Sequence, residues 1–218
     1  MELNKYIDHT LLKPTATERD IIDLCNEAKK FKFFSVCINS SYIPLAKQLL
    51  KGSSVKICTV VGFPLGATST EAKAFEAKQA IQEGASEIDM VLNIGFLKSK
   101  NYVEVFKDIS DVKLAIGKTP LKVILEISEL SKNDIVKACE ICLDAKVDFV
   151  KTSTGFSKSG ATLTAVKIMK KTIKGQIKIK ASGGIRDLDT VQKYLEVGVS
   201  RIGTSSGVDI VNEHLANA

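Results

Sequence analysis

The sequence predicts an α/β fold in which eight strands and their helices alternate around a closed parallel barrel. Short β-branched segments recur eight times in 218 residues, at a spacing of roughly 27 residues, and helical patterns lie between them. The main alternative, a doubly wound open sheet, normally carries a glycine-rich fingerprint after its first strand, but the segment DHTLLKP has no glycine. These observations favour a single-domain (β/α)8 TIM barrel over residues 1–218.

The strand candidates are short runs rich in valine, isoleucine and aromatic residues. The first of them, YIDHTLL, is the weakest. In chain order the candidates span residues 6–12, 33–39, 55–63, 87–95, 121–128, 147–153, 177–184 and 200–206.

The helical segments between the strands carry start and stop signals. Three begin with a capping-box spacing, in which a serine or threonine precedes an acidic residue by three positions. The pairs are Thr17 with Asp20, Thr68 with Glu71, and Ser131 with Asp134. Four helical segments are followed by a glycine, where we expect a left-handed cap: Gly84, Gly117, Gly175 and Gly198.

The charge of the chain is modestly basic. It carries 31 basic and 25 acidic residues, a net charge of +6, and its isoelectric point is near 9.0. The excess is spread along the chain, without an arginine cluster or a tryptophan, and this favours a solvated lysine-rich surface over a nucleic-acid-binding one. We therefore expect no nucleic-acid partner, although a basic chain attracts small anions.

Apolar runs and cysteines indicate a cytoplasmic protein without a membrane span. No apolar run approaches the roughly 20 residues of a membrane helix, and the N-terminus lacks the pattern of a signal peptide. The five cysteines lie inside apolar patterns and are interpreted as reduced thiols. Cys139 and Cys142 form a CxxC motif within a predicted helix, which favours core packing over redox or metal chemistry.

The segment DFVKTSTGFS places Lys151 at the end of an apolar strand. An unpaired buried lysine is costly, and reactive groups in such barrels lie at the carboxyl ends of the strands. Side-chain alternation predicts an inward-pointing charged set, with one group at this end and another deeper. The first group is Lys151, Lys180, Asp89 and Glu126; the second is Lys122 and Lys178, which we interpret as paired interior charges.

Lys151 and Lys180 lie on neighbouring predicted strands. Two ammonium groups that lie close together disfavour double protonation, so the pKa of one of them is lowered. A neutral amine is the form that condenses with a carbonyl to give a Schiff base.

Glycines and serines at the ends of the last two strands predict an anion site. The segment SGGIRD places Gly183 and Gly184 before a helix, and IGTSSGVDI places Gly203, Ser205 and Ser206 before another. Backbone N–H groups at helix N-termini bind anions, and these two loops form the usual phosphate site of the fold.

The chain resembles the deoxyribose-phosphate aldolase family of class I aldolases nearly from end to end. The segments that carry the resemblance are DHTLLKP, VGFPLG, EIDMVLNIG, KVILE, FVKTSTGF, KASGGIR and RIGTSS. The resemblance implies reversible cleavage of 2-deoxy-D-ribose 5-phosphate to D-glyceraldehyde 3-phosphate and acetaldehyde, in deoxyribose phosphate catabolism. It implies no metal and no other cofactor. We expect a small phosphorylated sugar as partner and a homo-oligomer, with a dimer favoured.

The resemblance also implies roles for residues. Lys151 forms the Schiff base, Lys180 tunes it, and Asp89 transfers protons through a water molecule. The substrate-binding residues are Gly155, Gly183, Gly184, Gly203, Ser205 and Ser206 around the phosphate, and Asp8 and Thr10 around the hydroxyls.

Two positions depart from the pattern of some family members. Phe156 stands where these members place a lysine near the phosphate, and the C-terminus, VNEHLANA, lacks their terminal tyrosine.

Three alternative functions remain open: a non-catalytic phosphate-binding barrel, an RNA-binding protein, and a barrel isomerase or synthase. The last more often places carboxylates than two lysines at these strand ends.

Overall fold

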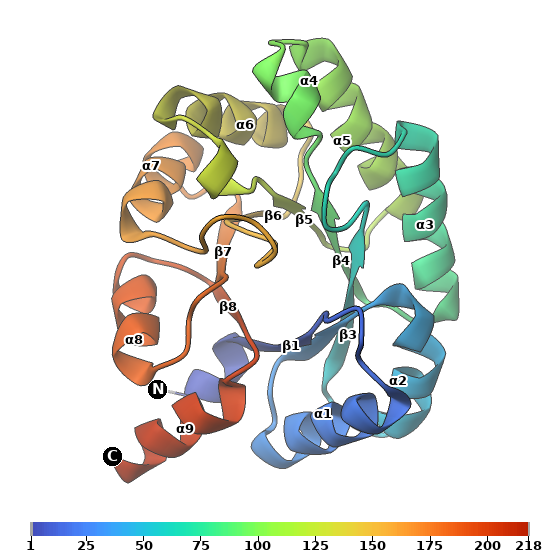
Figure 1. Ribbon diagram of the computed structural model, residues 1–218, viewed down its shortest axis with the longest axis vertical. Helices are drawn as coiled ribbons and strands as arrows, with labels where there is room; N and C mark the ends of the chain where they lie inside the picture. The colour runs from blue at the N-terminus through green and yellow to red at the C-terminus, as the bar shows by residue number, and fades with distance from the viewer. Residues whose placement is uncertain (1, 218) are drawn as a thin grey trace.

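The computed structural model describes residues 2–217, which form a closed barrel of eight parallel strands surrounded by helices (Figure 1). Each strand pairs in parallel with the next, and β8 closes the barrel against β1. The strands are β1 (Ile7–Leu11), β2 (Ser35–Ile38), β3 (Lys56–Val61), β4 (Glu87–Val91), β5 (Leu121–Ile124), β6 (Phe149–Lys151), β7 (Lys178–Ser182) and β8 (Arg201–Thr204). The predicted (β/α)8 barrel is therefore confirmed.

The helices form the outer layer and cover the outward faces of the strands (Figure 1). They are α1 (Glu18–Phe31), α2 (Ile43–Leu49), α3 (Thr70–Glu83), α4 (Ile94–Lys98), α5 (Tyr102–Ile116), α6 (Lys132–Asp144), α7 (Leu163–Ile173), α8 (Leu188–Glu196) and α9 (Gly207–Ala216). Short 3-10 helices are η1 (Leu3–Tyr6), η2 (Ser40–Tyr42) and η3 (Ile127–Glu129). No helix within residues 2–217 is both long and apolar enough to cross a membrane.

Several strands are shorter at their carboxyl ends than the apolar patterns predict. The candidate 87–95 ends at Val91, and 121–128 ends at Ile124. Leu92 and Leu125, the next residues, are completely buried although they lie outside the strands. The sequence pattern predicted these strands too long because the loop residues that follow them are also apolar and pack into the core.

The helix-start predictions are confirmed in two of three places. Thr17 with Asp20 and Ser131 with Asp134 form complete capping boxes. The third prediction is wrong, because α3 is capped by Ser69, whose side chain accepts a hydrogen bond from the Ala72 N–H at 3.3 Å. The segment TST offers adjacent hydroxyls, and the cap lies one residue later than predicted. The four glycines expected after helices all adopt positive φ angles.

The space between strands and helices is filled by apolar side chains. Outward positions such as Ile88, Met90, Val123 and Val150 are completely buried. All five cysteines are free and buried, and Cys139 and Cys142 pack in α6. Because this layer uses the outward faces, the inward faces are free to hold polar groups.

Candidate active site

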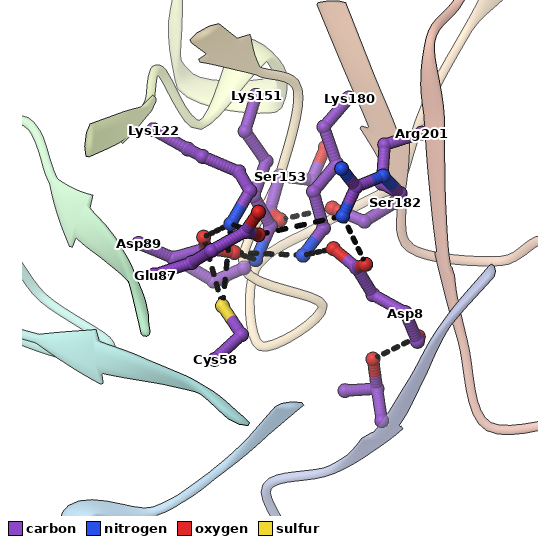
Figure 2. A network of polar contacts seen from close by, with 12 residues as sticks. Asp8, Cys58, Glu87, Asp89, Lys122, Lys151, Ser153, Lys180, Ser182 and Arg201 are labelled. Atoms are coloured by element: carbon purple, nitrogen blue, oxygen red, sulfur yellow. Dashed lines mark hydrogen bonds and ion pairs between the residues drawn. The ribbon is translucent and has the colours of Figure 1, made fainter. Parts of the chain in front are cut away.

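A buried network of charged side chains fills the interior of the barrel (Figure 2). Asp89 on β4 is completely buried and lies at its centre. Its Oδ1 accepts a hydrogen bond from the Lys122 Nζ at 2.8 Å. Its Oδ2 accepts hydrogen bonds from the Nζ atoms of Lys151 and Lys180, each at 2.8 Å. Three ammonium groups thus share one carboxylate.

Strand register explains why these side chains meet. Lys151 and Lys180 are Cα partners in the pairing of β6 with β7, and Asp89 and Lys122 are partners in the pairing of β4 with β5. Partners in a parallel ladder point to the same face. The predicted juxtaposition of the two lysines on neighbouring strands is confirmed.

A second carboxylate, Asp8 on β1, holds the other side of the network. Its Oδ2 lies 2.5 Å from the Lys180 Nζ, and its Oδ1 accepts hydrogen bonds from Arg201 at 2.8 Å and from Ser35 at 2.7 Å. Glu87 completes the network from below, 2.6 Å from the Lys122 Nζ and 3.4 Å from Arg201. Four cations therefore face three carboxylates.

Electrostatics keeps Asp8 and Asp89 ionised. Burial acts to raise the pKa of Asp89, but three neighbouring ammonium groups outweigh burial and hold that pKa well below its usual range. Burial also acts to raise the pKa of Asp8, and Lys180 and Arg201 together bring it below the ordinary value.

The three lysines differ in the support that their charges receive. Burial acts to lower the pKa of Lys180, yet Asp8 and Asp89 outweigh burial and raise it well above its usual value. Lys122 likewise contacts two carboxylates, Glu87 and Asp89. Within residues 2–217, Asp89 is the only carboxylate paired with Lys151, and that carboxylate is shared. Lys151 is therefore the lysine with the least support for its positive charge.

An open pocket of about 310 Å³ lies at the carboxyl ends of β1, β6, β7 and β8. Lys151 lines it, whereas Lys122 and Lys180 are not among its described lining residues. Six of the eight predicted substrate-binding residues line it as well: Thr10, Gly155, Gly183, Gly184, Gly203 and Ser205. Lys151 is thus an amine that both belongs to the buried network and reaches open space.

The other two predicted substrate-binding residues do not line the pocket. Asp8 is completely buried and engaged with Lys180 and Arg201. Ser206 lies at the start of α9, where its backbone N–H donates a hydrogen bond to the Thr204 hydroxyl at 2.9 Å. Direct contact of these two residues with the substrate therefore stays a prediction.

The prediction that Lys178 is a paired interior charge is wrong, and the alternation argument does not apply to Glu126. Lys178 is exposed, because it is the first residue of β7 at the open amino end of the barrel, where its Nζ lies 5.6 Å from the centroid of the Phe149 ring. Glu126 lies beyond the end of β5 at a φ of 56°, so strand alternation no longer fixes its direction. Lys122, in contrast, is the paired interior charge that the pattern predicts.

Two cations at the pocket were missed by the sequence analysis. Lys13 and Arg186 both line it. Each lies inside a segment that carries the family resemblance, DHTLLKP or KASGGIR, so the segments offered a signal that was not used. Phe156 also lines the pocket, is half exposed, and packs edge-on against Phe63 with ring centroids 5.3 Å apart.

Cysteine sulfurs touch the network on the side of β2 and β3. Ligand atoms of Cys37, Cys58 and Asp89 lie within 4.8 Å of one another. The Cys58 thiol donates a hydrogen bond to the Asp89 Oδ1 at 3.1 Å, and the Lys122 Nζ lies 3.4 Å from the same sulfur. The Lys122 ammonium group already contacts both the Cys58 sulfur and the Asp89 carboxylate, so we assign no metal to these three residues.

Comparisons with known proteins agree with this arrangement. A sequence model of the family described as DeoC/LacD family aldolase matches residues 3–213. The deoxyribose-phosphate aldolase 1 of Mesoplasma florum is 54% identical over 218 residues, which cover 100% of this chain and 99% of the relative. The deoxyribose-phosphate aldolase of Actinobacillus succinogenes is 56% identical over 210 residues, 96% of this chain and 94% of the relative.

Solved structures give the same result. The structure of a protein described as a putative deoxyribose-phosphate aldolase from Coccidioides immitis superimposes with a TM-score of 0.97 at 43% identity, covering 98% of this chain and 86% of that one. The deoxyribose phosphate aldolase from Aeropyrum pernix, described as tetrameric, gives a TM-score of 0.90 at 33% identity, covering 99% and 92%. The chain therefore belongs to the DeoC/LacD family of aldolases.

Proposed function

We propose that this aldolase reversibly cleaves 2-deoxy-D-ribose 5-phosphate to D-glyceraldehyde 3-phosphate and acetaldehyde through a Schiff base on Lys151. The observation that carries the proposal is the position of Lys151, which lines the pocket while sharing Asp89 with two other lysines. The names of the relatives, which are about 55% identical, support the substrate.

The proposed reaction uses Lys151 as a neutral amine, the form that attacks a carbonyl. Four buried cations face three carboxylates, and loss of one proton would equalise them. The proposal assigns that proton to Lys151, which shares Asp89 with two other lysines and lines the pocket. The resulting amine can attack the C1 aldehyde of the open-chain sugar, and loss of water from the adduct gives an iminium ion.

The iminium ion then accepts the electron pair of the breaking C2–C3 bond. A base removes the proton of the C3 hydroxyl, D-glyceraldehyde 3-phosphate leaves, and an enamine of acetaldehyde remains on Lys151. Protonation of the enamine and hydrolysis release acetaldehyde and the free amine. Asp89, acting through a water molecule, is the proposed proton relay, because its carboxylate lies 2.8 Å from the Lys151 Nζ, beside the reacting centre.

The phosphate is proposed to bind at the glycine-rich side of the pocket. Gly155, Gly183, Gly184, Gly203 and Ser205 line that side, and Lys13 and Arg186 add positive charge. Gly183 has a φ of 90°, and an added Cβ there would lie 2.8 Å from the Gly160 Cα. Thr10 is proposed to contact a sugar hydroxyl. Asp8, which holds Lys180, is proposed to lie near the same hydroxyl.

One domain over residues 1–218, a homo-oligomer with a dimer favoured, and a cytoplasmic location in deoxyribose phosphate catabolism complete the proposal. The free thiols of all five cysteines support a reducing compartment. The molar mass of the protein in solution tests the oligomer.

Borohydride reduction in the presence of acetaldehyde tests the proposed chemistry. We expect the intact mass to rise by one ethyl group and peptide mapping to place that group on Lys151. A label on Lys180 would exchange the roles of the two lysines, and a protein that is never labelled would refute the Schiff base.

A further inference from the structure

Two carboxylates of the loop after β5, those of Glu126 and Glu129, form hydrogen bonds with the loop after β6. Glu126 contacts Thr154, which lines the pocket. Glu129 accepts hydrogen bonds from Ser157 at 2.7 Å and from Lys158 at 2.9 Å, farther along the same loop. The first contact is buried, whereas the Lys158 side chain of the second is 75% exposed.

Glu126 is held in an unusual state for an acidic residue. It is 3% exposed, and its backbone adopts the left-handed region at φ 56° and ψ 64°. Its Oε2 accepts hydrogen bonds from both the N–H and the hydroxyl of Thr154, while its Oε1 has no hydrogen-bond partner among residues 2–217. A strained backbone around a buried carboxylate indicates a position with a function.

Hydrogen bonding by Glu126 decides which donors of the next turn remain available. The Thr154 N–H is taken by Glu126, and the Phe156 N–H donates to the Thr154 hydroxyl oxygen at 3.0 Å. The N–H of Gly155, between them, makes no hydrogen bond within residues 2–217, and Gly155 lines the pocket at a φ of 88°. One backbone donor of the turn is thereby left for a ligand.

We propose that Glu126 is a positioning residue for the phosphate of the substrate. By holding both polar groups of Thr154, it fixes the turn from Thr154 to Phe156 so that the Gly155 N–H faces the anion. The inference rests on the proposed function, since it presumes a phosphorylated substrate. Glu126 itself is not among the described residues that line the pocket, so it acts through the turn and not on the reacting atoms.

The variants separate hydrogen bonding from charge. Glu126→Gln keeps an oxygen that can accept both bonds from Thr154 and removes the negative charge behind the anion site. We expect its KM for 2-deoxyribose 5-phosphate to stay within about twofold of wild type or to fall. Glu126→Leu removes the acceptor, and we expect its KM to rise about tenfold or more, because two hydrogen bonds of ordinary strength are lost.

Thr154→Val tests the same contact from the other side and serves if Glu126→Leu fails to fold. It should raise the KM for the sugar phosphate, and the double variant should add little to either single change, because both remove the same contact. Glu129→Gln is the matched control. It alters only the outer contacts of the same two loops, and we expect it to leave KM and kcat unchanged.

Two further readouts distinguish this role from a merely structural one. In Glu126→Leu we expect unchanged borohydride trapping of acetaldehyde and an unchanged KM for unphosphorylated 2-deoxyribose. Equal increases in KM for both sugars, or a loss of trapping, would overturn the proposal. So would a folded Glu126→Leu protein whose KM for the phosphorylated sugar equals that of the wild type.

Calorimetric titration with inorganic phosphate makes the outcome independent of catalysis. Wild type should bind phosphate more tightly than Glu126→Leu, whether or not the protein cleaves the sugar. If wild type neither traps acetaldehyde nor cleaves the sugar, the proposed function fails, and the difference in phosphate affinity still decides the role of Glu126. Equal phosphate affinity in the two proteins would refute it.

Discussion

Buried lysines occur in two regions of this molecule that differ in how their charge is balanced. Between α3 and α5, Lys73 is completely buried and its Nζ lies 2.6 Å from Asp108, which is 1% exposed. The same Nζ donates a hydrogen bond to the Val91 carbonyl at 3.1 Å, and Thr70 donates one to Asp108 at 3.1 Å. One cation meets one carboxylate, and both have further partners.

The barrel interior does not reach that balance. Its four cations share three carboxylates, and one of the cations, Lys151, opens onto a pocket. A closed and neutral pair can only hold helices together, whereas an excess cation beside open space can give up its proton to become a nucleophile. Under the proposed function, the difference teaches that unequal sharing of a carboxylate, and not burial alone, distinguishes the nucleophilic lysine.

The largest expected effect is that of Lys151→Arg. Arginine keeps the positive charge next to Asp89 but cannot act as the nucleophile, so aldol cleavage and borohydride trapping should both be lost. Circular dichroism and the melting temperature should stay close to wild type, because the ion pair with Asp89 can be kept. Trapping that persists in this variant would show that another amine carries the Schiff base.

Lys180→Leu should have the next largest effect on activity. Without Lys180, Asp89 is shared by fewer cations and pairs more closely with Lys151. We expect activity near neutral pH to fall by about two to three orders of magnitude, because Lys180 no longer disfavours a second positive charge beside it. Trapping of acetaldehyde on Lys151, followed by mass spectrometry, should be slow and should recover as pH is raised. A trapping rate with no pH dependence would contradict this explanation.

Lys73→Met should destabilise the fold by removing the cation of the buried pair between α3 and α5. It leaves Asp108 buried without its cation, which costs about 3 to 5 kcal/mol in the free energy of unfolding. The activity of the folded fraction at low temperature should be unchanged. The double variant Lys73→Met with Asp108→Leu should recover much of the lost stability, because no unpaired charge remains. Urea denaturation measures the free energy of unfolding of the single and the double variant. A loss of kcat without a loss of stability in Lys73→Met would show that the Lys73–Asp108 pair is not purely structural.

The smallest expected effect is seen in acid. The folded-state pKa of Asp8 is lowered below its ordinary value, chiefly because Lys180 and Arg201 outweigh burial. A lowered carboxyl pKa gives stability that is fully present above about pH 4 and is lost as pH falls through the folded pKa. The difference in unfolding free energy between wild type and Asp8→Asn should therefore shrink below about pH 4. A difference that stays constant from neutral pH to about pH 3 would count against this electrostatic coupling.

The sequence by itself determined the barrel and the pairing of its two key lysines. Strand alternation has a period of two, and consecutive βα units become neighbours in a parallel barrel, so Lys151 and Lys180 had to meet. Glycine positions near Gly183 followed from local backbone chemistry in the same way. These properties depend on short stretches of chain and on the order of the units, and both can be recognised in a sequence.

Only the tertiary structure decided how the charges are shared and where the pattern stops. Asp8 pairs with Lys180 and Arg201 from the opposite end of the chain, and no local pattern fixes which carboxylate each lysine meets. Lys178 is exposed and Glu126 turns to Thr154 because strand ends are set by packing against neighbouring loops, not by alternation. The excess cation at Lys151 is a property of the assembled barrel, since it depends on side chains from six different strands.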